Sequence, residues 1–374
     1  MMQLAADLHI HSCFSMASSP RMLPEEIIAG CRIKGISIIG TGDILHPEWR
    51  AMWQECIVPD DIVVIPTTEV ESERRVHHLI LLPGFDAAAE LADTFSRNSK
   101  NIGSNGRPRV NLSGGEILRA VHETGGLGGP AHAFTPYTSV YASHDSLSSC
   151  YGDEPVDLLE LGLSADSRYG AGIRELEGVP FLTNSDAHSP DSAKLGREFT
   201  VLELNSKTPE SVLQAVCDGS VVMNAGFFPE EGKYNRTGCS RCYREFSAQE
   251  AEQLRWKCPD DNGRIKLGVS DRAGMLSSDT RSPRPPYLHL IPLIEIIQRL
   301  TGASGPNTRR CRDLYDTCIT RFGDEITVLT LTPPEEIAAI HPDLATAVTA
   351  FREGRIILHP GCGGRYGSFE IPGI

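Results

Sequence analysis

The chain has 374 residues, 40% of them hydrophobic and 22% charged, a composition that is typical of a folded globular protein and excludes an intrinsically disordered one. The formal net charge is -14, which excludes a protein that binds nucleic acid through its overall charge alone. Residues 1–231 hold 32 Asp and Glu against 16 Lys and Arg, whereas residues 232–374 hold 17 against 19. We therefore expect any contact with phosphates to use local basic clusters in the second part.

Signals for secretion or membrane insertion are not visible in the sequence. The N-terminal residues lack a basic leader followed by an apolar run, and no stretch approaches the ~18 consecutive apolar residues of a membrane span. The chain has 11 Cys, an odd number that we interpret as thiols or metal ligands and not as a disulfide framework. We therefore expect a cytoplasmic protein that does not bind membranes.

Short apolar runs alternate with amphipathic helices through the first 230 residues. The run LPEEIIAGCRIKG predicts a helix that begins at Pro24 and is capped by Gly35, and Ser113 with Glu116 forms a capping box at the start of another helix. Strands are predicted at 36–40, 62–66, 76–83, 156–163 and 179–186, and a further helix at 208–219. This order predicts an α/β fold with a βα-type parallel sheet or barrel.

Three polar segments rich in Gly, Pro or Ser interrupt this pattern and predict long loops or linkers. They are residues 98–114, 277–287 and 301–310. We interpret the second of them as a boundary between domains.

The segment ADLHIHSCFS (5–14) raises the first question of function. In a strand, Asp7, His9 and His11 would project from one face, because alternate residues point the same way. Two neutral imidazoles beside a carboxylate suit a bound cation. A polar strand end without a metal explains an isolated pair of histidines equally well.

Nearly all of the remaining predicted strands also end in histidine or carboxylate side chains. Active sites of parallel barrels lie at the C-terminal ends of their strands, so we expect these side chains to share one site. The set exceeds what one tetrahedral ion requires, and two or three ions are therefore expected. Its further members are Asp43, Glu69, Glu71, His77, His78, His132, Glu160, Asp186 and His188.

The ordered motifs ADLHIHS, GTGD, TTEVE, VHHL, PAHAF and NSDAHSP, over about residues 1–225, resemble those of the PHP (polymerase and histidinol phosphatase) superfamily. The resemblance implies a distorted (β/α)7 barrel that hydrolyses phosphoesters with two or three divalent ions (Zn, Mn or Mg). A His or Asp that some relatives carry shortly after the first motif is not evident in SCFSMASS (12–19).

The resemblance also implies roles for individual residues. His78 is the alternative to His77 as a ligand, and Asp43 stands where many relatives have His. We expect Asp186, Glu69 and His132 to act in catalysis. The implied metal ligands are His9, His11, Asp43, Glu69, His77, His132, Asp186 and His188.

A second module follows the predicted barrel. Cys239 and Cys242 form one CxxC pair, and Cys258 is followed at the same spacing by Asp261. With a fourth Cys this would be a zinc-ribbon signature, and carboxylate oxygen also binds zinc. We expect one structural Zn on these four residues; an empty site, or three buried cysteines, is the alternative.

Basic and aromatic residues are interleaved around this module, which favours contact with nucleic acid because cations bind phosphate and aromatic faces stack on bases. An ordinary basic surface is the alternative. A glycine-rich turn, PGCGGRYGSF (360–369), offers a further backbone approach to phosphate. The predicted DNA-contacting residues are Arg241, Arg244, Arg264, Lys266, Arg272 and Arg365.

The whole arrangement is similar to the endonuclease Q family of archaea and some bacteria. The resemblance implies a PHP barrel at 1–230, a zinc-ribbon-like module at 231–280 and a small, mainly helical DNA-contacting region at 281–374. It implies a DNA repair endonuclease that cleaves on the 5′ side of uracil, hypoxanthine, xanthine or an abasic site, and we expect a monomer by default. Damaged DNA is the implied partner, together with other repair or replication proteins.

Two further functions remain open on the sequence alone. One is a PHP-family phosphatase or phosphodiesterase that acts on a small phosphorylated metabolite. The other is a non-catalytic DNA-binding module with a degenerate metal site.

Overall fold

Eight strands build the first part of the computed structural model, which describes residues 1–374. They are β1 (Met2–Asp7), β2 (Ile38–Gly40), β3 (Val63–Ile65), β4 (Thr67–Glu71), β5 (His77–Leu81), β6 (Leu127–Pro130), β7 (Leu159–Glu160) and β8 (Phe181–Leu182). β1, β2 and β3 pair in parallel, as do β7 and β8, whereas β4, β5 and β6 pair antiparallel.

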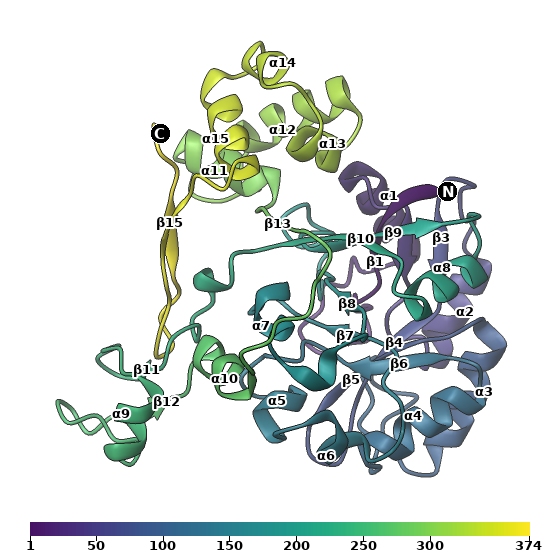
Figure 1. Ribbon diagram of the computed structural model, residues 1–374. Coiled ribbons are helices and arrows are strands. Elements are labelled where there is room, and N and C mark those ends of the chain that lie inside the picture. Colours follow the sequence, from purple (N-terminus) through teal and green to yellow (C-terminus); the bar gives the residue numbers. More distant parts are fainter.

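These strands succeed one another around a distorted barrel (Figure 1). β3 runs on into β4 through Pro66, whose carbonyl accepts a hydrogen bond from Leu82 N. The Ala133 amide donates to the Glu160 carbonyl and connects the β6 and β7 segments, and the Asp186 amide donates to the His9 carbonyl and connects the β8 segment back to β1. The predicted distorted α/β barrel is therefore confirmed, and its distortion is the antiparallel β4–β5–β6 unit.

Helices surround the barrel where the local sequence signals predicted them. Pro24 occupies the first turn of α1 and Gly35 ends it with φ 88°, a conformation that glycine adopts without strain. Ser113 and Glu116 form the predicted capping box of α4, and Thr208 caps α8 through Ser211 N. The helices of this part are α1 (Pro24–Lys34), α2 (Pro47–Glu55), α3 (Phe85–Ser96), α4 (Gly114–Glu123), α5 (Val140–Ser143), α6 (Leu147–Tyr151), α7 (Ser167–Ala171) and α8 (Pro209–Cys217), with a 3-10 turn η1 (Arg174–Leu176).

Three strands outside the sequence prediction widen one side of the barrel. β9 (Phe199–Leu204) pairs antiparallel with β1, β10 (Val221–Gly226) pairs antiparallel with β9, and β13 (Tyr287–His289) pairs in parallel with β10. The resulting sheet has the order β13-β10-β9-β1-β2-β3. The region after residue 281 thus contributes a strand to the barrel sheet, and the division at 230 and 280 stays a prediction.

The predicted zinc-ribbon-like module (residues 231–280, called the ribbon below) projects at the lower left of Figure 1 over residues 238–266, whereas its last helix packs against α7 of the barrel. A 3-10 turn η2 (Pro229–Glu231) leads into it, and its elements are β11 (Gly238–Cys239), α9 (Ala248–Gln253), β12 (Ile265–Lys266) and α10 (Val269–Leu276). Its hydrophobic core is small and consists of Cys239, Phe246, Ala251, Cys258 and Ile265. Two of these five core residues are predicted metal ligands, so apolar packing contributes little to the stability of this module.

Five helices and a hairpin complete the chain. They are α11 (Leu293–Thr301), α12 (Arg309–Phe322), α13 (Glu325–Thr330), α14 (Pro334–Ala338) and α15 (Pro342–Arg352), followed by β14 (Ile357–His359) and β15 (Ser368–Glu370). The predicted mainly helical C-terminal region is confirmed. Its helices share one hydrophobic core with the barrel, and a buried Lys34–Glu325 ion pair of 2.5 Å joins α1 to α13.

The β14–β15 hairpin runs from these helices down to the ribbon (Figure 1). Its glycine-rich tip contacts the ribbon through the Arg236 amide, which donates to the Gly361 carbonyl, and through Cys362 Sγ, which donates to the Tyr243 carbonyl. No helix of the chain is long and apolar enough to span a bilayer.

Candidate active site

The first site residues lie on the extended segment that continues β1. The side chains of His9 and His11 lie in one cluster with Asp186, whereas Leu8 and Ile10 between them are buried in the core, as the strand alternation predicted. Asp7 is different. Its carboxylate accepts hydrogen bonds from the amides of Ser185 and Gly196, both at 3.0 Å. Asp7 therefore fastens the chain behind the site and does not belong to it.

One cluster of potential ligands consists of His9, His11 and Asp186, whose ligand atoms all lie within 4.8 Å of one another. Asp186 Oδ1 is 3.1 Å from His11 Nε2 and 3.9 Å from His9 Nε2. The two histidines are almost fully buried, while a third of the Asp186 side chain is exposed (33%). Asp186 therefore forms the open side of the cluster.

A second cluster consists of Glu69 on β4, His77 on β5 and His132 after β6. Glu69 Oε1 lies 2.6 Å from His77 Nδ1 and 2.9 Å from His132 Nε2. Its other oxygen, Oε2, lies 3.4 Å from His11 Nε2. Glu69 thus faces both clusters, one with each carboxylate oxygen.

Strained backbone marks the turns that carry these side chains. Asp43, His132 and Asp186 have φ values of 47°, 32° and 46°, which non-glycine residues rarely adopt. Such strain persists where the surrounding structure holds it, commonly at functional sites. Of these three residues, His132 and Asp186 line a pocket of the barrel and Asp43 does not.

Buried carboxylates orient the histidines from behind. His9 Nδ1 donates to Glu160 at 2.9 Å, and Glu160 also accepts from the His132 amide and from Asn184 Nδ2, both at 2.8 Å. This leaves His9 Nε2 directed to Glu69 and Asp186, at 3.9 Å from a carboxylate oxygen of each. A carboxylate on the far nitrogen is the usual way to fix the tautomer and raise the basicity of a ligand histidine.

Asp43 plays the same part for His11. His11 Nδ1 donates to Asp43 Oδ1 at 3.1 Å, while Oδ2 accepts from the Ser12 amide, the Ser12 hydroxyl and the Ser15 hydroxyl at 2.6 to 2.7 Å. Both oxygens are therefore engaged, and Asp43 is absent from the two clusters. The predicted role of Asp43 as a ligand does not agree with this geometry, which favours an orienting role.

The remaining predicted ligands differ in position. His188 stacks on His11 with 4.2 Å between ring centroids, and its Nε2 lies 3.6 Å from Asp186 Oδ1. His78 points away from the pocket and contacts the Tyr151 hydroxyl at 2.9 Å. Of the two neighbouring histidines, His77 is the one that the fold places among the candidate ligands.

The chemistry of the pocket fits divalent cations. His9 Nε2, His11 Nε2 and His132 Nδ1 are buried and have no hydrogen-bond partner, an arrangement that costs free energy unless another group satisfies them. Burial alone would lower the pKa of His9, but the carboxylates of Glu160, Glu69 and Asp186 outweigh it and raise this pKa to about 9. The carboxylates therefore stabilise positive charge in this site, whether on a histidine or on a bound cation.

The pocket beside the clusters has a volume of about 320 Å³. Arg107 is its one Lys or Arg and comes from the segment 98–114 that the sequence predicted to be a loop. The remaining lining residues are His77, His132, Thr135, Thr138, Glu160, Gly162, Leu163, Ser164, Asn184 and Asp186.

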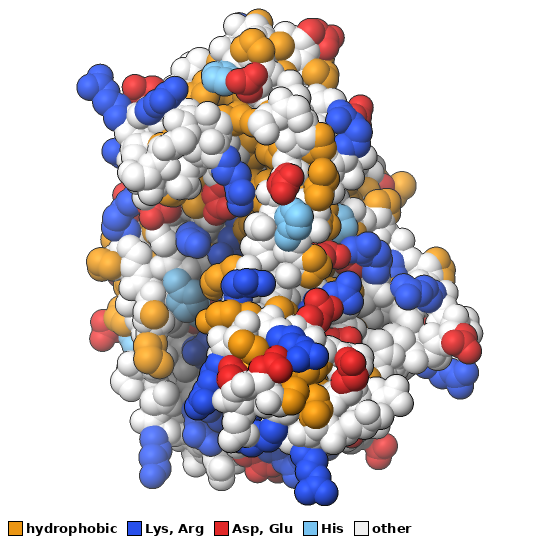
Figure 2. All heavy atoms as spheres, turned by 90° about the vertical axis from the view of Figure 1, so that its left-hand side faces the viewer, with side chains coloured by type: hydrophobic (Ala, Val, Ile, Leu, Met, Phe, Trp, Pro, Cys, Tyr) orange, Lys and Arg blue, Asp and Glu red, His pale blue; other side chains and the backbone are white.

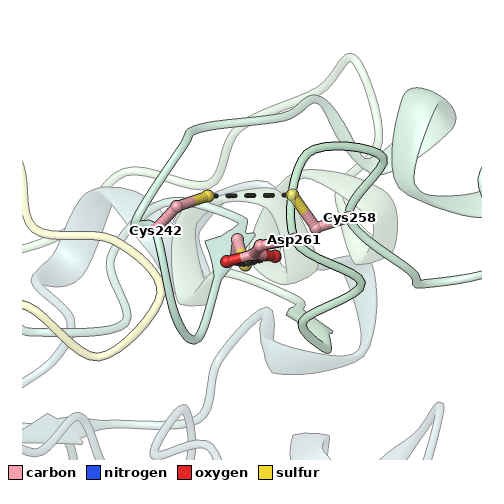
Figure 3. A group of neighbouring side chains, drawn as sticks. Cys242, Cys258 and Asp261 are labelled. Atoms are coloured by element: carbon pink, nitrogen blue, oxygen red, sulfur yellow. Dashed lines mark hydrogen bonds between the residues drawn. The ribbon is translucent and has the colours of Figure 1, made fainter.

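The four predicted ribbon ligands also converge. Cys242 Sγ and Cys258 Sγ are 3.7 Å apart (Figure 3), and Cys239 Sγ is 3.3 Å from Asp261 Oδ1. Zn–S bonds of about 2.3 Å in a tetrahedron place sulfur atoms about 3.8 Å apart. The Gly263 amide donates to Asp261 Oδ1 at 2.8 Å and holds the pKa of this carboxyl below its ordinary value. These groups therefore fit a Cys3Asp zinc site.

Two solved structures are similar to this chain over its full length. The crystal structure of the lesion-specific endonuclease PfuEndoQ from Pyrococcus furiosus is similar over 100% of this chain and 96% of that chain, with 42% identity and a TM-score of 0.95. A structure of endonuclease Q with a 27-mer duplex substrate that carries an abasic lesion at the active site covers 100% of this chain and 97% of that chain, with 41% identity and a TM-score of 0.92.

The chain belongs to the endonuclease Q family.

Two further relatives are uncharacterized proteins. The uncharacterized protein YqxK of Bacillus subtilis is 30% identical over 99% of this chain and 100% of its own length. The uncharacterized protein MJ0043 of Methanocaldococcus jannaschii is 41% identical over 64% of this chain, and the match spans 31% of the length of MJ0043. Residues 292–355 match the family described as MJ0043 C-terminal domain.

Some of the predicted DNA-contacting side chains of this endonuclease Q relative line a hollow, and the others lie on the exposed parts of the ribbon and hairpin. Arg264 and Lys266 line a hollow of about 640 Å³ together with Tyr137 and Tyr234. Arg272 lines it too, but its guanidinium donates to the carbonyls of Tyr141 and His144 and to Asp145. Arg272 therefore ties the ribbon to the barrel, while Arg264 and Lys266 have no such tether.

The three other predicted contacts lie on the exposed parts of the ribbon and hairpin. Arg241 donates to the Asp261 carbonyl, Arg244 pairs with Asp260 at 2.8 Å, and Arg365 lies over the Tyr243 ring at 5.6 Å. Figure 2 shows Lys and Arg side chains along the hollowed face that carries the ribbon. This concentration of charge is local, because the whole chain is acidic.

Proposed function

We propose that this chain is a metal-dependent endonuclease that hydrolyses phosphodiester bonds in damaged DNA. The observation that carries the proposal is the pair of histidine–carboxylate clusters that Glu69 joins. The similarity to endonuclease Q structures over the full length of the chain supports the substrate class.

Two divalent ions fit the two clusters. His9, His11 and Asp186 would hold one ion, Glu69, His77 and His132 the other, and Glu69 faces both. Zn, Mn or Mg bound here would lower the pKa of a water molecule and neutralise charge on a phosphate. We propose direct catalytic contact for Asp186, Glu69 and His132, with His188 as a further ligand beside Asp186.

The supporting residues keep the clusters in place for this reaction. Glu160 and Asp43 hold the Nδ1 atoms of His9 and His11, so that both Nε2 atoms remain directed to the pocket. The backbone strain at His132 and Asp186 is held by the barrel and fixes the direction of their side chains. Such preorganisation avoids rearrangement of these groups during the reaction.

For the substrate, we propose cleavage on the 5′ side of uracil, hypoxanthine, xanthine or an abasic site. A pocket enclosed by the barrel cannot admit a base that is stacked in a duplex, so the lesion nucleotide must rotate out, which is easiest where pairing is already weak. The open side at Asp186 is where such a nucleotide would enter.

The ribbon and the C-terminal region would hold the duplex. We propose the division 1–230, 231–280 and 281–374 for catalytic, ribbon and DNA-contacting parts, with Zn on Cys239, Cys242, Cys258 and Asp261. Arg264 and Lys266 are the best placed to bind phosphate, because neither is committed to a protein carboxylate. We further propose action as a monomer, with other repair or replication proteins as partners.

Nicking of end-labelled duplexes tests the proposal. Duplexes with one uracil, hypoxanthine or abasic site, and an undamaged control, would be incubated with Zn, Mn or Mg. We expect a nick 5′ of the lesion that Asp186→Ala abolishes and that Asp153→Ala, a change of an exposed carboxylate, leaves intact. Intact lesion duplexes with folded, metal-loaded protein that hydrolyses small phosphomonoesters would reject the proposal.

A further inference from the structure

The inference concerns Arg107, which lies in the loop before α4 and which the sequence patterns did not single out. Its guanidinium donates to Glu69 Oε2 at 3.0 Å, and 28% of the side chain is exposed. It is the one Lys or Arg in the pocket beside the clusters. Resting on the proposed function, we infer that Arg107 is a catalytic residue that grips the phosphate undergoing hydrolysis.

Two tethers fix the loop on either side of Arg107. The Gly106 amide donates to the Phe14 carbonyl, and a Cβ at Gly106 would collide with Asp43 Oδ2 and the Ser15 hydroxyl. On the other side, the Pro108 carbonyl accepts from the Glu71 amide, and the Glu71 carbonyl accepts from the Val110 amide. The loop is thus held against the support of His11 and against β4, and the guanidinium is placed between them.

The position of the guanidinium relates it to the substrate. Glu69 Oε2, which Arg107 contacts, also lies 3.4 Å from His11 Nε2. A phosphate held by ions at the two clusters would therefore lie next to Arg107. The guanidinium makes one hydrogen bond in the structure, so most of its five N–H groups remain free for phosphate oxygens.

The charge balance of the pocket supplies the reason for a cation here. Glu69, Asp186, Glu160 and Asp43 place four carboxylates around His9 and His11, and a fifth, Glu71, lies 3.4 Å from His77 Nε2. Two divalent ions would offset these carboxylates and leave little positive charge for an anionic phosphodiester. Arg107 provides that charge, because a guanidinium is protonated throughout the physiological pH range.

The step itself is a displacement at phosphorus. The water molecule loses one proton as its oxygen bonds to phosphorus, the bond from phosphorus to the leaving sugar oxygen breaks, and the sugar oxygen takes up a proton, so that protons balance overall. Arg107 exchanges none of these atoms. It donates hydrogen bonds to non-bridging oxygens, where negative charge is held in the transition state.

The chain offers a matched control on the same loop. Arg109 is two residues away, is 59% exposed, pairs with Glu71 at 3.6 Å and does not line the pocket. The experiment compares Arg107→Gln, Arg107→Lys and Arg109→Gln by single-turnover cleavage of an abasic-site duplex. Metal content by mass spectrometry and duplex affinity by fluorescence anisotropy accompany each rate.

We expect Arg107→Gln to slow cleavage by on the order of 100-fold, the usual loss when one charge-stabilising donor is removed. Its metal content should match the wild type, Arg107→Lys should fall between the two, and Arg109→Gln should stay within about twofold. Equal rates for Arg107→Gln and Arg109→Gln would overturn the inference. Loss of bound metal in both Arg107 variants would also overturn it, because Arg107 would then act by supporting Glu69.

Failure of the proposed function looks different. If the wild type itself leaves the abasic-site duplex intact while metal-loaded and folded, the endonuclease proposal fails before any variant is compared. If the wild type nicks and Arg107→Gln nicks equally well, only the assignment of Arg107 fails.

Discussion

The barrel and the ribbon both gather metal-binding side chains, but they support them in opposite ways. In the barrel, His9 and His11 are held by Glu160 and Asp43, which are in turn fixed by amides and hydroxyls of neighbouring strands. In the ribbon, Cys242 is exposed and the small core already counts Cys239 and Cys258 among its members. The barrel site is built by the fold, whereas the ribbon depends on its ligands for much of its order.

The difference shows what each metal is needed for. A preformed site with a second layer of hydrogen bonds keeps its geometry when the ions leave, so the ions serve the reaction. A small module without a sufficient apolar core takes its folding free energy from metal binding. Removing metal should therefore stop chemistry in the barrel and loosen structure in the ribbon.

The largest effect is expected at the residue that faces both barrel clusters. Glu69→Gln removes the shared charge, and we expect cleavage of an abasic-site duplex to slow by about 1000-fold or more, equivalent to several kcal/mol of lost stabilisation. Circular dichroism should show an unchanged fold, because the barrel does not depend on its ions. An unfolded variant would contradict the view that the barrel, unlike the ribbon, keeps its fold without its ions.

The ribbon should respond in the other way. Cys258→Ser removes one of the four ligands, and we expect the protein to lose one bound zinc per chain and to expose the ribbon to proteolysis, since the module loses its source of folding free energy. Zinc content and the sites of limited trypsin cleavage measure this. The control is Cys217→Ser, which changes an exposed cysteine of α8. A ribbon that resists trypsin without zinc would contradict the prediction.

A smaller effect separates an orienting carboxylate from a ligand. Asp43→Asn weakens the hold on His11 Nδ1, and we expect metal affinity in the barrel to fall by about 10- to 100-fold with the number of bound ions at saturation unchanged. Titration followed by calorimetry measures both quantities. A decrease in the number of bound ions would make Asp43 a direct ligand, as the sequence resemblance implied.

The smallest effect tests whether the barrel has stability of its own, away from any metal. His122 on α4 lies 2.7 Å from Glu154 and 2.9 Å from Asp157, and these partners raise its pKa in the folded state against the effect of burial. Stability from a raised histidine pKa is fully present below the unfolded pKa and is lost as pH rises through the folded pKa.

His122→Gln should therefore lower the free energy of unfolding by roughly 1 kcal/mol below about pH 6 and by less as the pH rises. Urea unfolding at several pH values measures the difference, with Gln214→Ala on exposed α8 as the control. A difference that is constant with pH would mean that the charge on His122 contributes nothing.

Local signals in the sequence were enough for much of this architecture. The proline and glycine that bound α1, the capping box of α4 and the two-residue spacing of His9 and His11 each depend on neighbours a few residues apart. The Cys spacing of the ribbon is of the same kind. Such features follow from backbone geometry, so the sequence by itself determined the fold class and most of the candidate ligands.

Tertiary structure decided what each polar side chain faces. Glu160 lies 151 residues along the chain from His9, which it orients, and Arg107 lies 38 residues from Glu69. Strand β9 pairs with β1, although nearly the whole barrel separates them in the sequence. The sequence suggests that Asp43 is a metal ligand. In the structure its Oδ2 accepts hydrogen bonds from the hydroxyls of Ser12 and Ser15, which favours a role in orienting His11. Hydrogen bonds between distant strands are made by closure of the barrel, and no local pattern records them.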